Sequence, residues 1–278
     1  MIDTFQLLIC PFAACLVIAL IHCYMGIHVV SREVIFVDLA LAQIAALGIS
    51  VAILMGHEAM STQSFVFSII FTLLGAVLFA LGRFREETVP HEAIIGIVYA
   101  VSSGISILVL DRAPHGLEEM KAMLVGNILF VTWRDILELT FLYVIIGIFC
   151  FMFHSKFMLI SKDIAKASKM GVSIRWWDFI FYLLFGIMVT KSVRIAGVLL
   201  VFSYLIIPAV CAMLFVSRLS HRLILGWLIA FMASFLGLFF SARFDMPTGA
   251  SLVATFGLVL IISALIRPLI IKLRSKAK

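Results

Sequence analysis

The chain has 278 residues, of which 64% are hydrophobic and 13% are charged, and its formal net charge is +6. Water-soluble domains are about 45–50% apolar, so this composition excludes a soluble domain and indicates a protein embedded in a lipid bilayer. The positive charge is typical of loops beside anionic lipid headgroups, and we do not take it as a sign of nucleic-acid binding.

Apolar segments follow one another along the whole chain, and a helix needs about 20 apolar residues to cross the membrane. Nine candidates lie at 5–29, 34–55, 64–82, 92–110, 136–153, 177–190, 195–216, 222–241 and 249–270. The sixth is short, which leaves eight crossings as the alternative. The sequence therefore predicts an all-α polytopic membrane helix bundle, with one transmembrane domain over residues 1–278.

The lysines and arginines predict how these segments are oriented. If the N-terminus lies outside and the chain crosses nine times, fifteen of the 21 Lys and Arg residues fall on one side. Cytoplasmic loops carry an excess of these residues, so this side is predicted to be the cytoplasm. It includes the segment 161–178 and the C-terminus. Lys191 and Arg194 are two bases on a short outer turn, and the sequence assigns them no role.

Several kinds of chemistry are missing from the sequence. The five cysteines lie in apolar segments without metal-site spacing, and we interpret them as packing residues rather than disulfides. The stretch "GIMVTKS" at 186–192 has threonine where a phosphate-binding loop needs its second glycine. The chain is therefore not expected to bind ATP in this way or to act as an enzyme.

Few acidic residues fall within the predicted spans, where a charge is costly and usually functional. Asp38 lies about one turn into the second span, and Glu92 lies at the start of the fourth. No span carries an acid near its centre, which argues against a proton-coupled antiporter.

The segment "SKDIAKASKMGVSIRWWD" at 161–178 is a basic island between two apolar spans. Residues from Ala165 to Lys169 are predicted to form a short helix, which Gly171 can end by taking a positive φ angle. Small side chains would allow this helix to sit closely against another protein. A solvated basic loop is the alternative interpretation.

Two later stretches carry helix-breaking residues. Gly197 and Pro208 interrupt the apolar stretch 194–215, where Pro208 favours a kink. Two interpretations remain: an ordinary proline kink in a packed helix bundle, or a kink that lines a translocation path through the membrane. In "FDMPTGA", Asp245 or Thr248 is predicted to cap the helix that follows.

Four segments resemble, in order, the permease subunits of ATP-binding-cassette importers for zinc, manganese or iron. They are "FVDLALAQIAALGIS" at 36–50, "LVGNILFVTWRDI" at 124–136, "RIAGVLLVFSYLIIPAVCAMLF" at 194–215 and "FDMPTGASLV" at 244–253. The island resembles the coupling segment of such permeases. The matches cover nearly the whole chain, and four in order are far more specific than any one.

The resemblance implies an importer in the bacterial cytoplasmic (inner) membrane, with the C-terminus in the cytoplasm. Two copies of the chain would form the path, and an extracytoplasmic metal-binding protein would deliver the substrate. A separate cytoplasmic ATPase would bind the coupling residues Asp163, Ala165, Ala167 and Gly171. The substrate would be a divalent metal, zinc first and then manganese or iron, with no stably bound cofactor.

The resemblance also implies a transient metal site, which this sequence alters. The family carries an aspartate and a histidine four residues apart in the second helix, and those positions here are Leu39 and Gln43. Leucine cannot ligate a metal, and glutamine offers only a neutral oxygen. The residues expected along the path are Asp38, Leu39, Gln43, Glu92 and Pro208. Candidate metal ligands in the outer loops, or solvated loop residues, are His57, His115, Glu118 and Glu119.

Three alternatives are open. Related permeases import metal chelates such as siderophores or cobalamin, and the altered site is compatible with such a substrate. A stand-alone ion channel or secondary carrier predicts flux through this chain alone. A membrane scaffold or enzyme predicts no flux with any partner.

Overall fold

The computed structural model describes residues 2–82, 90–113, 118 and 123–276. Within these ranges the chain is helical and forms no strand, and nine helices are long and apolar enough to cross a membrane. The predicted all-α membrane bundle is thereby confirmed. The sixth span runs over Ile174–Ala196, 23 residues rather than the predicted short segment, so the count is nine over the described part of the chain.

The spanning helices follow the predicted order along the chain. They are α1 (Ile2–Ser31), α2 (Val37–Leu54), α3 (Thr62–Leu81), α4 (His91–Leu110), α6 (Trp133–Met152), α9 (Ile174–Ala196), α10 (Val198–Phe215), α11 (Leu219–Phe244) and α12 (Thr248–Lys276). Three short helices whose full bounds are described lie between spans: η1 (Ile128–Phe130), α7 (His154–Lys162) and α8 (Ile164–Lys169).

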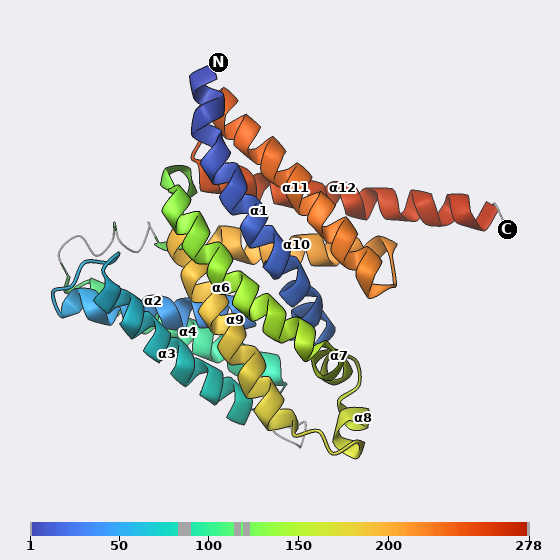
Figure 1. The fold of residues 1–278 in the computed structure, drawn as a ribbon, viewed down its shortest axis with the longest axis horizontal. Coiled ribbons are helices and arrows are strands. Elements are labelled where there is room, and N and C mark those ends of the chain that lie inside the picture. Colours follow the sequence, from blue (N-terminus) through green and yellow to red (C-terminus); the bar gives the residue numbers. More distant parts are fainter. Residues whose placement is uncertain (1, 83–89, 114–117, 119–122, 277–278) are drawn as a thin grey trace.

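The helices pack in two groups (Figure 1), which meet where α6 contacts both α1 and α9 and where α10 contacts α9 and α2. In one group α2 lies among α3, α4 and α9, and in the other α1 packs on α10 and α11, with α12 alongside. The outer face of α6 exposes Leu137, Phe141, Val144, Ile148 and Phe151. These residues recur every three to four positions, so lipid chains can solvate them as one continuous stripe.

Glycines allow the helices to approach closely, as is common where lipid provides no hydrophobic drive for association. A Cβ atom added to Gly48 would lie 2.7 Å from the carbonyl oxygen of Phe67 on α3. On α1, Gly26 meets the carbonyl group of Leu205 in the same way. Buried hydroxyl groups add interhelical hydrogen bonds, such as the 2.9 Å contact between Thr72 and Thr190.

The junction between α9 and α10 depends on two glycines in left-handed conformations. Gly197 has a φ angle of 79°, and Gly126, in the loop before η1, has a φ angle of 70°. Each glycine lies so close to the other's backbone that a Cβ atom on either would collide with it. The Asn127 N–H donates to the Ile195 carbonyl group at 3.2 Å. The Gly-Asn-Ile-Leu stretch therefore packs directly on this helix break.

The sequence assigned no role to Lys191 and Arg194. In the structure, both side chains bind groups on neighbouring segments at the predicted outer end of α9. Lys191 Nζ lies 2.8 Å from Glu138 Oε2 on α6. Arg194 donates to the Met60 carbonyl group at 2.8 Å and lies over the Phe65 ring. Both bases therefore belong to the last turns of α9 rather than to an outer turn.

Other sequence-based predictions have mixed outcomes. All five cysteines are free, which confirms that they form no disulfide. The sequence predicted that Asp245 or Thr248 caps the following helix, but Thr248 is the first residue of α12 and Asp245 does not cap that helix. Asp245 takes a left-handed conformation, with a φ angle of 51°, and ends α11 instead.

Candidate functional site

A cavity of about 160 Å³ lies between α2 and α4, close to the start of α10. Its lining consists of Gln43, Ala46, Ser50, Tyr99, Ser103, Ser106, Ile107, Leu110, Met123, Leu124 and Val198. Five of these side chains carry oxygen atoms, and Met123 contributes a thioether sulfur. Among the described residues, no carboxylate, histidine or cysteine lines the cavity.

Helical spacing places the polar side chains opposite one another. On α2, Gln43 and Ser50 are seven residues apart and therefore lie on one face. On α4, Tyr99, Ser103 and Ser106 follow at intervals of four and three residues, which again gives one face. The cavity forms where these two polar stripes meet inside an otherwise apolar bundle.

The serine hydroxyl groups present electron pairs to the cavity because their protons are used elsewhere. Ser50 donates to the Ala46 carbonyl group at 2.9 Å, and Ser103 donates to the Tyr99 carbonyl group at 2.8 Å. Ser106 donates in the same way to its own helix, to the Ser102 carbonyl group at 2.8 Å. Their lone pairs remain available, as do those of the Gln43 amide oxygen. The arrangement offers neutral oxygen donors suited to a cation.

The residues expected along the path do not all meet here. Gln43 lines the cavity, whereas Leu39 packs against the apolar core and Pro208 is buried within α10. Asp38 is 1% exposed, and its Oδ1 atom has no hydrogen-bond partner among the described residues. Glu92 lies in the first turn of α4, about two to five turns before the residues of α4 that line the cavity.

The outer-loop ligands stay a prediction. His57 is half-buried between α2 and α3, and Glu118 is exposed, while His115 and Glu119 lie outside the described residues. Within the described part of the chain, no three histidine, cysteine, aspartate or glutamate side chains come together.

Sequence reasoning found Gln43 but missed its partners on α4. Tyr99, Ser103 and Ser106 are spaced along one helix face within an apolar span, a pattern that was visible in the sequence. What the sequence did not reveal is that this face meets Gln43 and Ser50 rather than lipid.

The predicted short helix in the basic island is present as α8. Asp163 caps its N-terminus, since the Lys166 N–H donates to Asp163 Oδ1 at 2.8 Å. Gly171 follows the helix with a φ angle of 74°, the positive value expected from the sequence. Ala165 is exposed, but Ala167 is fully buried against the chain itself and does not face a partner.

Buried polar side chains link this segment to the spanning helices. Arg32 at the end of α1 donates to Ser161 Oγ on α7 at 2.9 Å and to Asp178 Oδ1 on α9 at 2.8 Å. Ser161 is also 2.9 Å from His28 Nδ1. Since α7 leads directly into α8, the exposed island is tied to both α1 and α9.

Comparisons with known proteins agree with this picture. Residues 4–267 match the sequence pattern of the ABC 3 transport family. The manganese transport system membrane protein MntC of Listeria monocytogenes is 24% identical over 184 residues, 66% of this chain and 65% of that protein, just under two thirds of its length. The manganese import system permease protein ScaB of Streptococcus gordonii is 23% identical over 263 residues, 95% of this chain and 92% of that protein.

The fold is similar to that of a solved structure. PsaBC from Streptococcus pneumoniae, in complex with Fab, superposes with a TM-score of 0.78 at 22% sequence identity. The superposition covers 94% of this chain and 93% of that one. At this level of identity the similarity concerns the fold.

Proposed function

The chain belongs to the ABC 3 transport family, and on this premise we propose that it forms the path of an ATP-driven manganese importer in the bacterial inner membrane. The observation that carries the choice of metal is the cavity between α2 and α4. Its donors are amide and hydroxyl oxygens, and hard cations such as Mn²⁺ favour oxygen ligands. The MntC and ScaB proteins, named for manganese, support the same choice.

Zinc was the first expectation from the sequence, and the cavity chemistry now ranks it below manganese. Zinc sites in proteins are built from thiolate, imidazole and carboxylate groups. The two second-helix positions at which the resemblance implies an aspartate and a histidine hold Leu39 and Gln43. None of the three groups that build zinc sites lines the cavity among the described residues.

The cavity size favours an ion over a chelate. Pockets that hold drug-sized ligands measure about 300–1,000 Å³, whereas this cavity measures about 160 Å³. It has room for a partly hydrated cation, and the polar stripes on α2 and α4 can replace part of the hydration shell.

The energy for transport would come from a separate ATPase on the predicted cytoplasmic side. The exposed residues of the island, Asp163, Ala165 and Gly171, are the proposed contact. Movement of α8 would be carried through α7 and the Arg32–Asp178 pair to α1 and α9, and would switch the path between its two access states. A second copy of the chain and an extracytoplasmic binding protein would complete the importer.

Uptake of radioactive manganese into proteoliposomes tests this function. The chain would be reconstituted with and without its cognate ATPase, with the binding protein added on the loading side. Uptake should require ATP and should be blocked by excess manganese more strongly than by excess zinc. ATP-independent flux through the chain alone would indicate a channel or carrier, and stronger blockage by zinc would contradict the assignment of the metal.

A further inference from the structure

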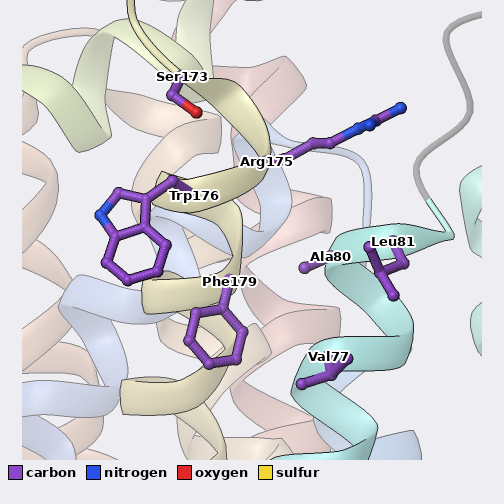
Figure 2. Close-up of a pocket in the computed structure, with 7 residues that line it drawn as sticks. All are labelled: Val77, Ala80, Leu81, Ser173, Arg175, Trp176 and Phe179. Carbon is purple, nitrogen blue, oxygen red and sulfur yellow. The ribbon is translucent and has the colours of Figure 1, made fainter.

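A second, larger cavity of about 380 Å³ lies between the last turns of α3 and the first turn of α9 (Figure 2). Its walls are Val77, Ala80 and Leu81 from α3, and Ser173, Arg175, Trp176 and Phe179 from α9. Three of its lining residues, Ser173, Arg175 and Trp176, belong to the last part of the basic island 161–178. It shares no lining residue with the cavity at Gln43.

The lining is apolar except at one edge. Arg175 is the only charged side chain among the described lining residues, and it extends from α9 towards the end of α3 (Figure 2). The described residues offer its guanidinium group no salt bridge or hydrogen bond. A guanidinium group that has no partner among the described residues and lies above apolar walls complements an amphiphile that carries a negative headgroup.

The apolar side of the cavity continues along α3. Large exposed side chains form one stripe on this helix: Ile70, Leu73, Leu74, Val77, Leu78 and Leu81. The last part of the stripe, Val77 and Leu81, is also the wall of the cavity. An acyl chain that starts in the cavity can therefore continue along α3 into the bilayer, which a water-soluble ligand or an ATPase surface cannot do.

The cavity also lies at the depth where headgroups are expected. The last turn of α3 and the first turn of α9 are the predicted cytoplasmic ends of two spans, on the side of the basic island. Trp176 is 58% exposed there, and tryptophan is enriched at the membrane–water boundary. Basic pockets between spans on this side are known binding sites for anionic lipids.

We propose that this cavity binds an anionic phospholipid of the cytoplasmic leaflet, whose phosphate group contacts Arg175 and whose acyl chain packs between α3 and α9. The lipid bridges α9 and α3 beside the point where the island enters the membrane. Its binding does not depend on which metal the importer carries.

Native mass spectrometry of the purified chain tests the proposal. The probes are phosphatidylglycerol and phosphatidylcholine with the same acyl chains, so that only the headgroup charge differs. The wild-type chain should retain phosphatidylglycerol in preference. Arg175→Gln should weaken this binding about tenfold, the loss expected for one hydrogen bond to a charged group. Arg175→Lys should retain part of it.

Arg218→Gln is the matched control. Arg218 is also exposed on the predicted cytoplasmic side and has no described partner, but it lines no part of the cavity. Its substitution should leave the lipid adducts unchanged. Leu81→Trp, which fills the apolar side, should reduce binding of both lipids.

Three outcomes would overturn the proposal. The first is equal retention of the two lipids by the wild-type chain. The second is an equal loss of phosphatidylglycerol in the Arg175 and Arg218 variants, which would indicate a general charge effect. The third is unchanged lipid adducts with lost ATPase association in Arg175→Gln, which would assign the cavity to the ATPase.

Discussion

Arg32 and Asp178 form a salt bridge in which Nη1 lies 2.8 Å from Oδ1, and neither side chain is exposed. The Arg32 guanidinium group also lies 4.0 Å from the centre of the Phe181 ring, and its Nε–H donates to Ser161. These contacts join α1, α7 and α9 next to the coupling island. The two opposite charges compensate each other, so that removal of one takes a salt-bridge partner away from a buried charge.

Asp178→Asn should therefore destabilise the chain by about 3–5 kcal/mol, the usual effect of breaking a buried ion pair. Thermal unfolding in detergent would measure the change. Glu138→Gln serves as the control, since Glu138 is 46% exposed and its pairs should contribute about 1 kcal/mol or less. The double variant Arg32→Met with Asp178→Leu should recover most of the lost stability. An Asp178→Asn variant as stable as the wild type would contradict this account of the pair.

The contact between Gly126 and Gly197 gives a second prediction. Gly126→Ala adds a Cβ atom that collides with the backbone of Ala196, and it forces a residue other than glycine into a positive φ angle. The left-handed conformation alone costs about 1–2 kcal/mol, and displacement of the junction adds to it. We expect a large loss of folded protein in fluorescence-detected size-exclusion chromatography.

Gly104→Ala is the control for this substitution. Gly104 lies within α4, and no atom lies within 4 Å of the position that its Cβ would occupy. Because alanine favours a helix over glycine by about 1 kcal/mol, this variant should be at least as stable as the wild type. Equal behaviour of the two alanine variants would show that the close approach at Gly126 is not needed.

The sequence predicted the helical class and order because hydropathy reports burial in lipid directly. It shortened the sixth span because Lys191 and Arg194 interrupt the apolar run. Those two bases stay in the helix since each has a partner, Glu138 for one and the Met60 carbonyl group for the other.

The sequence did not predict contacts between segments that are distant in the chain. Arg32 and Asp178 are 146 positions apart, and nothing in either local sequence selects the other. The same applies to the cavity, where Gln43 was singled out by resemblance but its partners depend on the packing of α4 on α2. Local backbone geometry was easier to predict from the sequence. The positive φ angle of Gly171, for example, follows from helix termination alone.

The oxygen-lined cavity predicts an effect of single hydroxyl groups on transport. Ser103→Ala should raise the manganese concentration needed for half-maximal uptake roughly fivefold, the effect of about 1 kcal/mol from one lost donor. Ser203→Ala is the matched control, because Ser203 makes a similar hydrogen bond to its own helix, at 2.9 Å, but does not line the cavity. Uptake that responds equally to both changes would place the path elsewhere.

Substitution of Gly171 tests whether an ATPase drives transport by docking on the island. A Cβ atom on Gly171 would meet no other atom within 4 Å, so Gly171→Trp places a bulky side chain on the exposed surface of the island without altering the core. If an ATPase docks there, the variant should lose ATPase co-purification and ATP-dependent manganese uptake, while its stability falls only by the strain of a positive φ angle, about 1–2 kcal/mol. Gly56 offers a matched position in an outer loop, since it also has a positive φ angle, of 90°, and an open Cβ direction. Gly56→Trp should keep both the ATPase and the uptake, because Gly56 lies outside the island. Both variants carry the strain of tryptophan at a positive φ angle, so this strain cannot account for a difference between them. ATP-driven uptake that persists in Gly171→Trp would show that the force enters the bundle through another segment.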